Sequence, residues 1–242
     1  MRSLFCSGLS LATLLLLTNS NLALANDPLS AQQTSQPTVQ QAIQQGIAAQ
    51  NRGDYAEAEA AYRSAIAQDS QNATHYYNLG NALGAQGKIE DAIAAYQTTL
   101  QLDPSNADAY YNLGYWLNEQ EQKGEALAAY RQAVKLQPFN ADVYYNLGVL
   151  LSEQGQLNEA EIILRRALLL NDTNVGAYSH LSDILITQGR FTEAETVLKR
   201  GINYLPRNSN LYYSLARSLE AQGRIQESVE AYDIVRRLRL KP

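Results

Sequence analysis

The fold of this chain is decided by the stretch Tyr76-Tyr77-Asn78-Leu79-Gly80, which returns as Tyr110-Tyr111-Asn112-Leu113-Gly114 and as Tyr144-Tyr145-Asn146-Leu147-Gly148. Each copy begins 34 residues after the one before it, and altered copies continue the series at 42–46, 178–182 and 212–216. In this phase six blocks fill the sequence without an insertion: 39–72, 73–106, 107–140, 141–174, 175–208 and 209–242. A fixed period of this length indicates an array of stacked helix pairs.

Each block carries the signals of two helices. In the second block, Tyr76, Leu79 and Leu83 follow the spacing of one helical face, and Gly87 favours the end of that helix. The second half of the block repeats the helical spacing and stops before Pro104. The third block has Glu121 where the others place the stop glycine, so we expect a looser or shifted turn there.

Composition excludes several classes of protein. The 242 residues carry a net charge of −5, and 45% are hydrophobic, which is ordinary for a folded protein. The mild acidity argues against a dedicated nucleic-acid binder, which usually needs a concentrated basic surface. Cys6 is the only cysteine, so an internal disulfide is impossible, and no zinc site of cysteine and histidine is available.

The first 25 residues have the pattern of a secretory signal peptide. Arg2 precedes an apolar run from Leu9 to Leu17, and Ala23-Leu24-Ala25 fits the small-residue cleavage pattern, so we expect cleavage after Ala25. An uncleaved membrane anchor is the alternative. Export to a periplasm, an equivalent lumen or the medium would follow, and the mature chain would contain no cysteine. Residues 26–38 are rich in Gln, Ser and Pro and are interpreted as a flexible linker.

From residue 39 onward, the chain resembles the tetratricopeptide repeat (TPR) family. The third block carries that family's pattern of large, small and aromatic residues nearly throughout, at Tyr110, Leu113, Gly114, Leu117, Ala126, Tyr130, Ala133 and Pro138. The second block is almost as close, the fourth departs at Leu164 and Asp172, and the remaining blocks match less well. The resemblance implies an all-α, right-handed α-solenoid of six stacked helix-turn-helix pairs, with an inner wall made of the first helices.

In similar proteins, fixed repeat positions on these first helices bind peptides. The resemblance places this groove at Tyr77, Asn78, Asn81, Tyr111, Asn112, Tyr115, Tyr145, Asn146, His180, Asp183, Tyr213 and Arg217. Three asparagines at one repeat phase form an asparagine ladder, whose amides can pair with the main chain of an extended peptide. A second interpretation is that these asparagines tie adjacent helices and that the tyrosines are simply common in the family. The lysines with which some TPR proteins grip the carboxylate end of a chaperone tail are missing, so such a partner is not expected.

Two further features concern the C-terminal part. Residues 39–174 carry 8 basic and 16 acidic residues, whereas residues 175–242 carry 10 and 7. The basic tail, at Arg236, Arg237, Arg239 and Lys241, either contacts anionic lipid or complements the helix dipole. No capping helix follows the sixth block, so Ile234 or Leu238 would be exposed unless covered by self-association or docking.

The sequence shows no recognisable arrangement of catalytic residues. His75 and His180 are isolated, no nucleophilic triad or phosphate-binding loop is present, and no metal or cofactor is expected. We therefore expect an exported, non-enzymatic scaffold that binds polypeptide segments in a Tyr/Asn-lined groove and assists assembly of an envelope or membrane complex. The alternative is a structural subunit that acts through self-association or docking of its C-terminal end.

Overall fold

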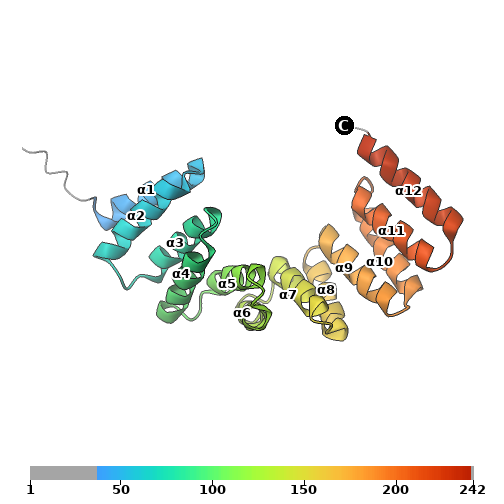
Figure 1. The fold of residues 1–242 in the computed structure, drawn as a ribbon, viewed down its shortest axis with the longest axis horizontal. Coiled ribbons are helices and arrows are strands. Elements are labelled where there is room, and N and C mark those ends of the chain that lie inside the picture. Colours follow the sequence, from blue (N-terminus) through green and yellow to red (C-terminus); the bar gives the residue numbers. More distant parts are fainter. Residues whose placement is uncertain (1–36, 241–242) are drawn as a thin grey trace, which may run out of the picture. The chain divides into compact units, whose positions relative to one another are not determined.

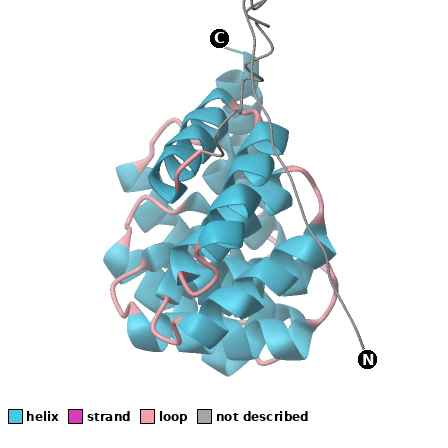
Figure 2. Ribbon diagram, turned by 90° about the vertical axis from the view of Figure 1, so that its left-hand side faces the viewer, coloured by secondary structure: helices cyan, strands magenta, loops and turns pink. Residues whose placement is uncertain are grey.

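The computed structural model describes residues 37–240. The expected signal peptide, residues 26–36 of the expected linker, and Lys241 lie outside the described residues. Within residues 37–240 the chain forms twelve α-helices and no strand (Figure 2). The all-α fold class is thereby confirmed. None of the described helices is both long and apolar enough to span a bilayer.

The helices form six pairs that follow one another in chain order (Figure 1). Their bounds are α1 Val39–Arg52, α2 Tyr55–Gln68, α3 Ala73–Ala85, α4 Ile89–Leu102, α5 Ala107–Glu119, α6 Lys123–Leu136, α7 Ala141–Glu153, α8 Leu157–Leu170, α9 Val175–Thr187, α10 Phe191–Tyr204, α11 Ser209–Ala221 and α12 Ile225–Leu240. We call the odd-numbered helices the first helices and the even-numbered ones the second helices. The first helices begin 34 residues apart, from Val39 to Ser209.

Side-chain caps fix where the first helices begin. An asparagine precedes each of the last five, and its side-chain oxygen accepts a hydrogen bond from a backbone N–H in the first turn; these caps are Asn72, Asn106, Asn140, Asn174 and Asn208. Thr38 does the same for α1, in a reciprocal capping box with Gln41. Such caps satisfy N–H groups that have no partner within the helix. The period of the array is therefore reinforced at every helix start.

The turns within the pairs share one backbone geometry. Five of them place a glycine in the left-handed region, with φ between 72° and 80°. In the third pair Glu121 takes this position with φ of 59°, the only positive φ of a non-glycine residue among those described. Helix α5 has the same length as α3 and α7. The expectation of a looser or shifted turn is wrong: the turn keeps its form and Glu121 adopts the unfavourable backbone conformation.

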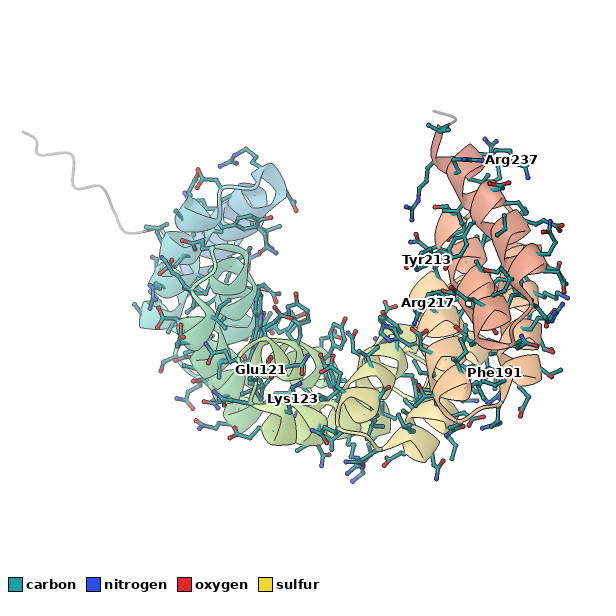
Figure 3. The ribbon with its side chains drawn as sticks, turned by 45° about the vertical axis from the view of Figure 1, so that its right-hand side comes forward. Glu121, Lys123, Phe191, Tyr213, Arg217 and Arg237 are labelled. Carbon is teal, nitrogen blue, oxygen red and sulfur yellow. The ribbon has the colours of Figure 1, made fainter. Side chains whose placement is uncertain are left out.

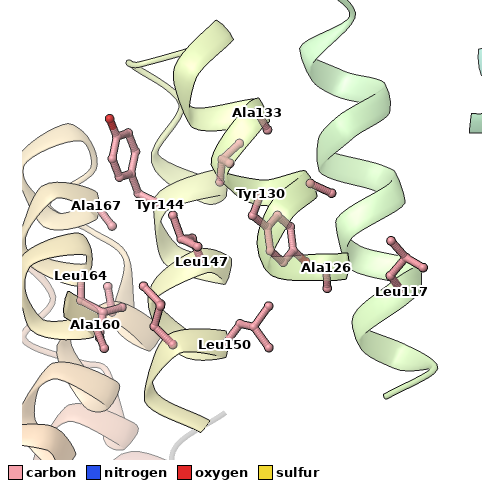
Figure 4. Packing of buried hydrophobic residues seen from close by; sticks show 14 of the residues in the cluster. Leu117, Ala126, Tyr130, Ala133, Tyr144, Leu147, Leu150, Ala160, Leu164 and Ala167 are labelled. Atoms are coloured by element: carbon pink, nitrogen blue, oxygen red, sulfur yellow. The ribbon is translucent and has the colours of Figure 1, made fainter. Parts of the chain in front are cut away.

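Within the first three pairs, a tyrosine of the second helix lies against a glycine of the first. A Cβ added to Gly80 would come within 2.8 Å of the Tyr96 ring, and one added to Gly114 within 2.9 Å of Tyr130. These buried tyrosines lie among leucines and alanines of the neighbouring helices, as Figure 4 shows for Tyr130. Only a residue without a side chain permits this approach, because protein interiors are close-packed.

Three of the five junctions between successive pairs share one kind of ion pair. A glutamate of one second helix meets a basic residue that precedes the next second helix, at 2.5–2.6 Å, in Glu59–Lys88, Glu161–Arg190 and Glu195–Arg224. The three glutamate side chains are only 12–14% exposed. In the other two junctions Ile93 and Leu127 occupy the glutamate's repeat position, and the basic residue is replaced by glutamine. The junction of the third and fourth pairs carries a different ion pair, between Arg131 and Glu159 at 2.9 Å.

Sequence analysis singled out Ile234 and Leu238 of α12 as apolar side chains that are exposed or covered by contact. Ile234 and Leu238 are both partly buried. The most exposed apolar side chains of this helix are Ile225, Val229 and Leu240, with 58%, 49% and 75% exposure. Docking through Ile234 and Leu238 stays a prediction.

Candidate functional site

All twelve predicted groove residues lie on first helices and are at least partly exposed. They come from α3, α5, α7, α9 and α11, at the same few repeat positions. Figure 3 shows two of them, Tyr213 and Arg217, directed from α11 to the side lined by the first helices. We call this side the inner face. The helix period therefore gathers residues that are 34 apart in sequence into one row.

The asparagines at the centre of this row bind neighbouring repeats. The amide of Asn112 donates to the side-chain oxygen of Asn81 at 3.0 Å, and the amide of Asn146 donates to the Tyr111 hydroxyl at 2.9 Å. The oxygen of Asn81 also accepts a hydrogen bond from the Tyr96 hydroxyl at 2.7 Å. These contacts match the interpretation that the asparagines tie adjacent helices. The Asn112 amide also donates to the Tyr77 hydroxyl at 3.5 Å, so Asn112 keeps its oxygen, whereas Asn146 keeps its oxygen and one N–H.

The hydrogen bond between Asn146 and Tyr111 leaves the tyrosine hydroxyl able to donate. Because the oxygen of Tyr111 accepts from Asn146, its own proton is free for an outside acceptor. Burial raises the pKa of Tyr111 above its ordinary value, and the nearby Asp142 carboxylate adds to this effect. Burial raises the pKa of Tyr145 as well. Both phenols therefore stay protonated at neutral pH and present O–H donors within the row.

The row changes character at α9. His180 replaces the tying asparagine, and its ring lies 5.9 Å from that of Tyr145. The Tyr145 hydroxyl lies where a Cβ of Gly176 would be, since such an atom would approach it within 2.5 Å. Here an aromatic contact takes the place of the amide–hydroxyl bond of the earlier junctions.

Two predicted groove residues bind each other. The Arg217 guanidinium lies 2.8 Å from the Asp183 carboxylate, and both side chains are nearly half exposed. The acid and the cation therefore neutralise one another across the junction of α9 and α11. An exposed pair of this kind contributes little to stability, so a ligand can separate it at small cost.

Sequence reasoning missed Trp116, which lies beside the row. Its indole meets the Tyr115 ring edge-on at 4.8 Å between centroids. A Cβ on Gly84 of the preceding repeat would come within 2.7 Å of the indole. The signal in the sequence was Gly84, a helical glycine outside the family pattern. As the only tryptophan of the chain, Trp116 can report on this part of the inner face.

Nothing in residues 37–240 suggests a catalytic or metal centre. No group of three or more potential metal-ligating side chains comes together in this range. His75 is buried, and neither of its ring nitrogens has a hydrogen-bond partner. Its Nε2 atom is 3.5 Å from a carboxylate oxygen of Asp69, with no nucleophile beside it.

Comparison with known protein families identifies the family of the chain. A family model described as the C-terminal domain of cilia and flagella-associated protein 70, a TPR domain, matches residues 9–238. The chain belongs to this TPR family. No curated protein matches the chain.

Solved TPR structures match much of this TPR chain. MamA has 25% sequence identity and a TM-score of 0.64, covering 68% of this chain and 90% of its own. YrrB, described as a TPR protein with an unusual peptide-binding site, has 26% identity and a TM-score of 0.64, covering 74% and 93%. A tetratricopeptide repeat protein from Parabacteroides merdae ATCC 43184 shares the fold at 22% identity and a TM-score of 0.70, covering 81% and 78%. These similarities support a protein-interaction scaffold.

Proposed function

We propose that this TPR protein is an exported, non-enzymatic scaffold that binds extended polypeptide segments along its inner face. The observation that carries the proposal is the row of tyrosines and asparagines repeated from α3 to α7, in which the hydroxyls of Tyr77 and Tyr111 accept hydrogen bonds from amides of the next repeat. The peptide-binding site for which YrrB is described supports the same use of the fold. We further propose that the bound segments belong to an envelope or membrane complex under assembly.

The geometry suggests how the row would bind. The Tyr111 hydroxyl, positioned by Asn146, would donate to a peptide carbonyl, while the ring gives flat apolar contact at low entropic cost. The oxygens of Asn112 and Asn146 and the second N–H of Asn146 add acceptors and a donor nearby. These groups recognise the peptide main chain, so the interaction would demand little of the ligand's side chains. In this account the asparagines are positioning residues and the tyrosines make the main contacts.

Affinity capture from the exported fraction tests this proposal. The bait is residues 26–242, beside a variant with Tyr77→Ala, Tyr111→Ala and Tyr145→Ala and a second with Asn78→Ala, Asn112→Ala and Asn146→Ala. We expect a partner that the parent holds and both variants lose. Phe139→Ala, which removes a 77% exposed ring outside the row, is the matched control and should keep the partner.

Circular dichroism must show that all variants remain folded, because the asparagines also join repeats. Equal capture by parent and variants would refute the groove. Sequencing the N-terminus of the exported protein tests the export step, with Asn26 expected as the first residue. An intact N-terminus on an exported chain would instead support the anchor.

A structural subunit is the second candidate, favoured by the exposed apolar side chains of α12. Val229 is 49% exposed, whereas Ile93 and Leu127 at the same repeat position are partly buried and packed against the core. Self-association through α12 would give a mass that rises with concentration in sedimentation experiments and falls on Val229→Lys with Leu240→Lys. A constant monomer mass would eliminate it. Contact of Arg236, Arg237, Arg239 and Lys241 with anionic lipid stays a prediction.

A further inference from the structure

The fifth pair packs its two helices in the reverse manner of the first three. In those pairs the first helix supplies glycine and the second supplies tyrosine, as in Gly80 and Tyr96. In the fifth pair the first helix supplies Tyr178 and the second supplies Gly201, whose added Cβ would come within 2.9 Å of the Tyr178 ring. The Tyr178 side chain is consequently fully buried, whereas Tyr76, at the same repeat position, is not.

This reversal lies beside a cavity of about 200 Å³ between α8, α9 and α10. Its apolar lining comes from Leu168, Leu169, Leu181 and Val197. Tyr178 also lines it, and the buried Tyr178 hydroxyl has no hydrogen-bond partner. Burying a hydroxyl without a hydrogen-bond partner is unfavourable. A polar ligand atom in the cavity would relieve that cost.

Two arginines complete the lining of the cavity. Arg165 is already paired with Glu161 at 2.8 Å. The guanidinium of Arg200 lies 5.9 Å from the Tyr204 ring centre and has no ion pair within residues 37–240. A guanidinium held against an aromatic ring and lacking a carboxylate partner favours an anionic ligand group.

The surface beside the cavity is apolar in a way that the repeat does not require. Ile162 and Leu169 on α8 are each 68% exposed and lie seven residues apart, on one face. At the position of Ile162 the other five blocks have alanine, threonine or glutamate. At the position of Leu169 they have alanine, glutamine, lysine, asparagine or arginine. The two large apolar side chains therefore belong to this place in the array and not to the family pattern.

An equivalent cavity between the first and second pairs provides an internal comparison. It measures about 210 Å³ and is lined at matching repeat positions, with Tyr76 for Tyr178 and Thr98 for Arg200. The Tyr76 hydroxyl there donates to the Ser70 carbonyl at 3.3 Å, and Asp91 contributes an acidic group to the lining. The two cavities have similar size and share an arginine at one repeat position, Arg63 or Arg165, but only the cavity beside Tyr178 has a second arginine, Arg200.

We propose that the cavity lined by Tyr178, Arg165 and Arg200 binds a bulky apolar side chain of an acidic polypeptide segment. The apolar side chain would fill the leucine-lined space, since a cavity of about 150 Å³ already holds benzene. A neighbouring carboxylate of the segment would pair with Arg200, and a polar atom of its main chain would bond the Tyr178 hydroxyl. None of the cavity residues belongs to the row on the inner face, so this site is separate from the proposed groove.

Titration with a defined peptide tests this site. The probe is acetyl-Gly-Glu-Leu-Glu-Gly-amide, with Leu→Ala and Glu→Lys versions as controls, titrated into the chain by calorimetry. We expect the probe to bind at least tenfold more tightly than either control peptide, because a hydrogen bond to a charged group contributes about 1.5–3 kcal/mol. Arg200→Thr, which reproduces the Thr98 environment, should weaken binding about tenfold or more, and Tyr178→Phe about threefold. Thr98→Ala and Tyr76→Phe should leave it unchanged.

The groove and the cavity are distinguished by two further arms. Asn112→Ala should bind the probe as tightly as the parent. Binding of the probe should leave the emission of Trp116 unchanged. No measurable binding, equal affinity of the Arg200→Thr variant, or loss of binding in Asn112→Ala would each overturn the proposal. Binding of 3-phenylpropanoate through Arg200 without binding of the peptide would also overturn it, since the ligand would then be a small free acid.

Discussion

Glu121 shows how strictly the repeat controls single residues. Its backbone takes the left-handed conformation that glycine takes in the other five turns. A side chain in this region is disfavoured by about 1–2 kcal/mol. The ion pair of Glu121 with Lys123 at 3.3 Å offers little compensation, because the Glu121 side chain is 80% exposed.

Replacing Glu121 with glycine should therefore stabilise the array. We expect Glu121→Gly to raise the free energy of unfolding by about 0.5–1 kcal/mol, the relief of strain being partly offset by the greater entropy of the unfolded chain. Urea unfolding followed by circular dichroism measures this change. Gly155→Ala is the matched control and should lower stability by a similar amount. A lower stability of Glu121→Gly would show that the turn is not strained.

The asparagine ladder shows that the identity of a residue does not determine its hydrogen-bond partner. Asn112 and Asn146 are identical in sequence context, and the sequence placed both on the inner face. Their actual partners, Asn81 and Tyr111, lie 31 and 35 residues away, in the preceding repeat. Whether an amide meets a neighbour or a ligand depends on the spacing of adjacent helices. The period alone does not give that spacing.

At the scale of helices, the junctions between pairs determine the response to acid. The hydrogen bond from Lys88 lowers the pKa of Glu59 from its ordinary 4.5 to about 2, with further lowering by Arg63. Arg190 lowers the pKa of Glu161, and Lys199 and Arg224 lower that of Glu195. A carboxylate with a lowered pKa in the folded state stabilises fully above its unfolded value. That contribution is lost as the pH falls toward the folded value.

The melting temperature should accordingly fall as the pH is lowered from about 5 to about 2. Glu59→Gln should make this fall smaller by about 2–4 °C, because its junction no longer loses a charge. Thermal unfolding at pH 7, 4 and 3 measures the effect. Glu125→Gln, an exposed position without an ion pair among the described residues, is the control and should follow the parent. Identical pH dependence of the parent and Glu59→Gln would refute the role of this junction.

The fifth pair has a helix-packing contact that the family pattern does not predict. Tyr178 keeps the tyrosine that Tyr76 and Tyr110 have at the same repeat position, whereas Gly201 stands where the second and third blocks have Thr99 and Ala133. At the positions of the usual glycine–tyrosine pair the fifth pair has Ser182 and Leu198, and the close contact forms between Tyr178 and Gly201 instead. A pattern that scores positions independently cannot represent such an exchange. The cavity beside Tyr178 follows from side-chain packing and was not predictable from the sequence.

At the scale of the whole array, most of the fold could be predicted from the 34-residue period of the sequence. Helix order, helix pairing and the position of the turns follow from stacking one supersecondary unit six times. The inner face was predicted correctly in its residues' placement on the first helices. The contacts between those residues were not, because they depend on neighbouring repeats. The caps at Asn72 and its four counterparts were visible in the sequence as a residue recurring at the end of each block, yet the family pattern does not draw attention to them.

The central claim is that the inner face binds extended polypeptide, and the fluorescence of Trp116 tests it most directly. Peptides selected on the purified chain from a random decapeptide library are titrated while Trp116 emission is followed. Our account predicts a saturable change in emission that disappears in the Tyr77→Ala, Tyr111→Ala, Tyr145→Ala variant. Selected peptides that bind this variant with undiminished affinity and leave Trp116 emission unchanged would contradict it.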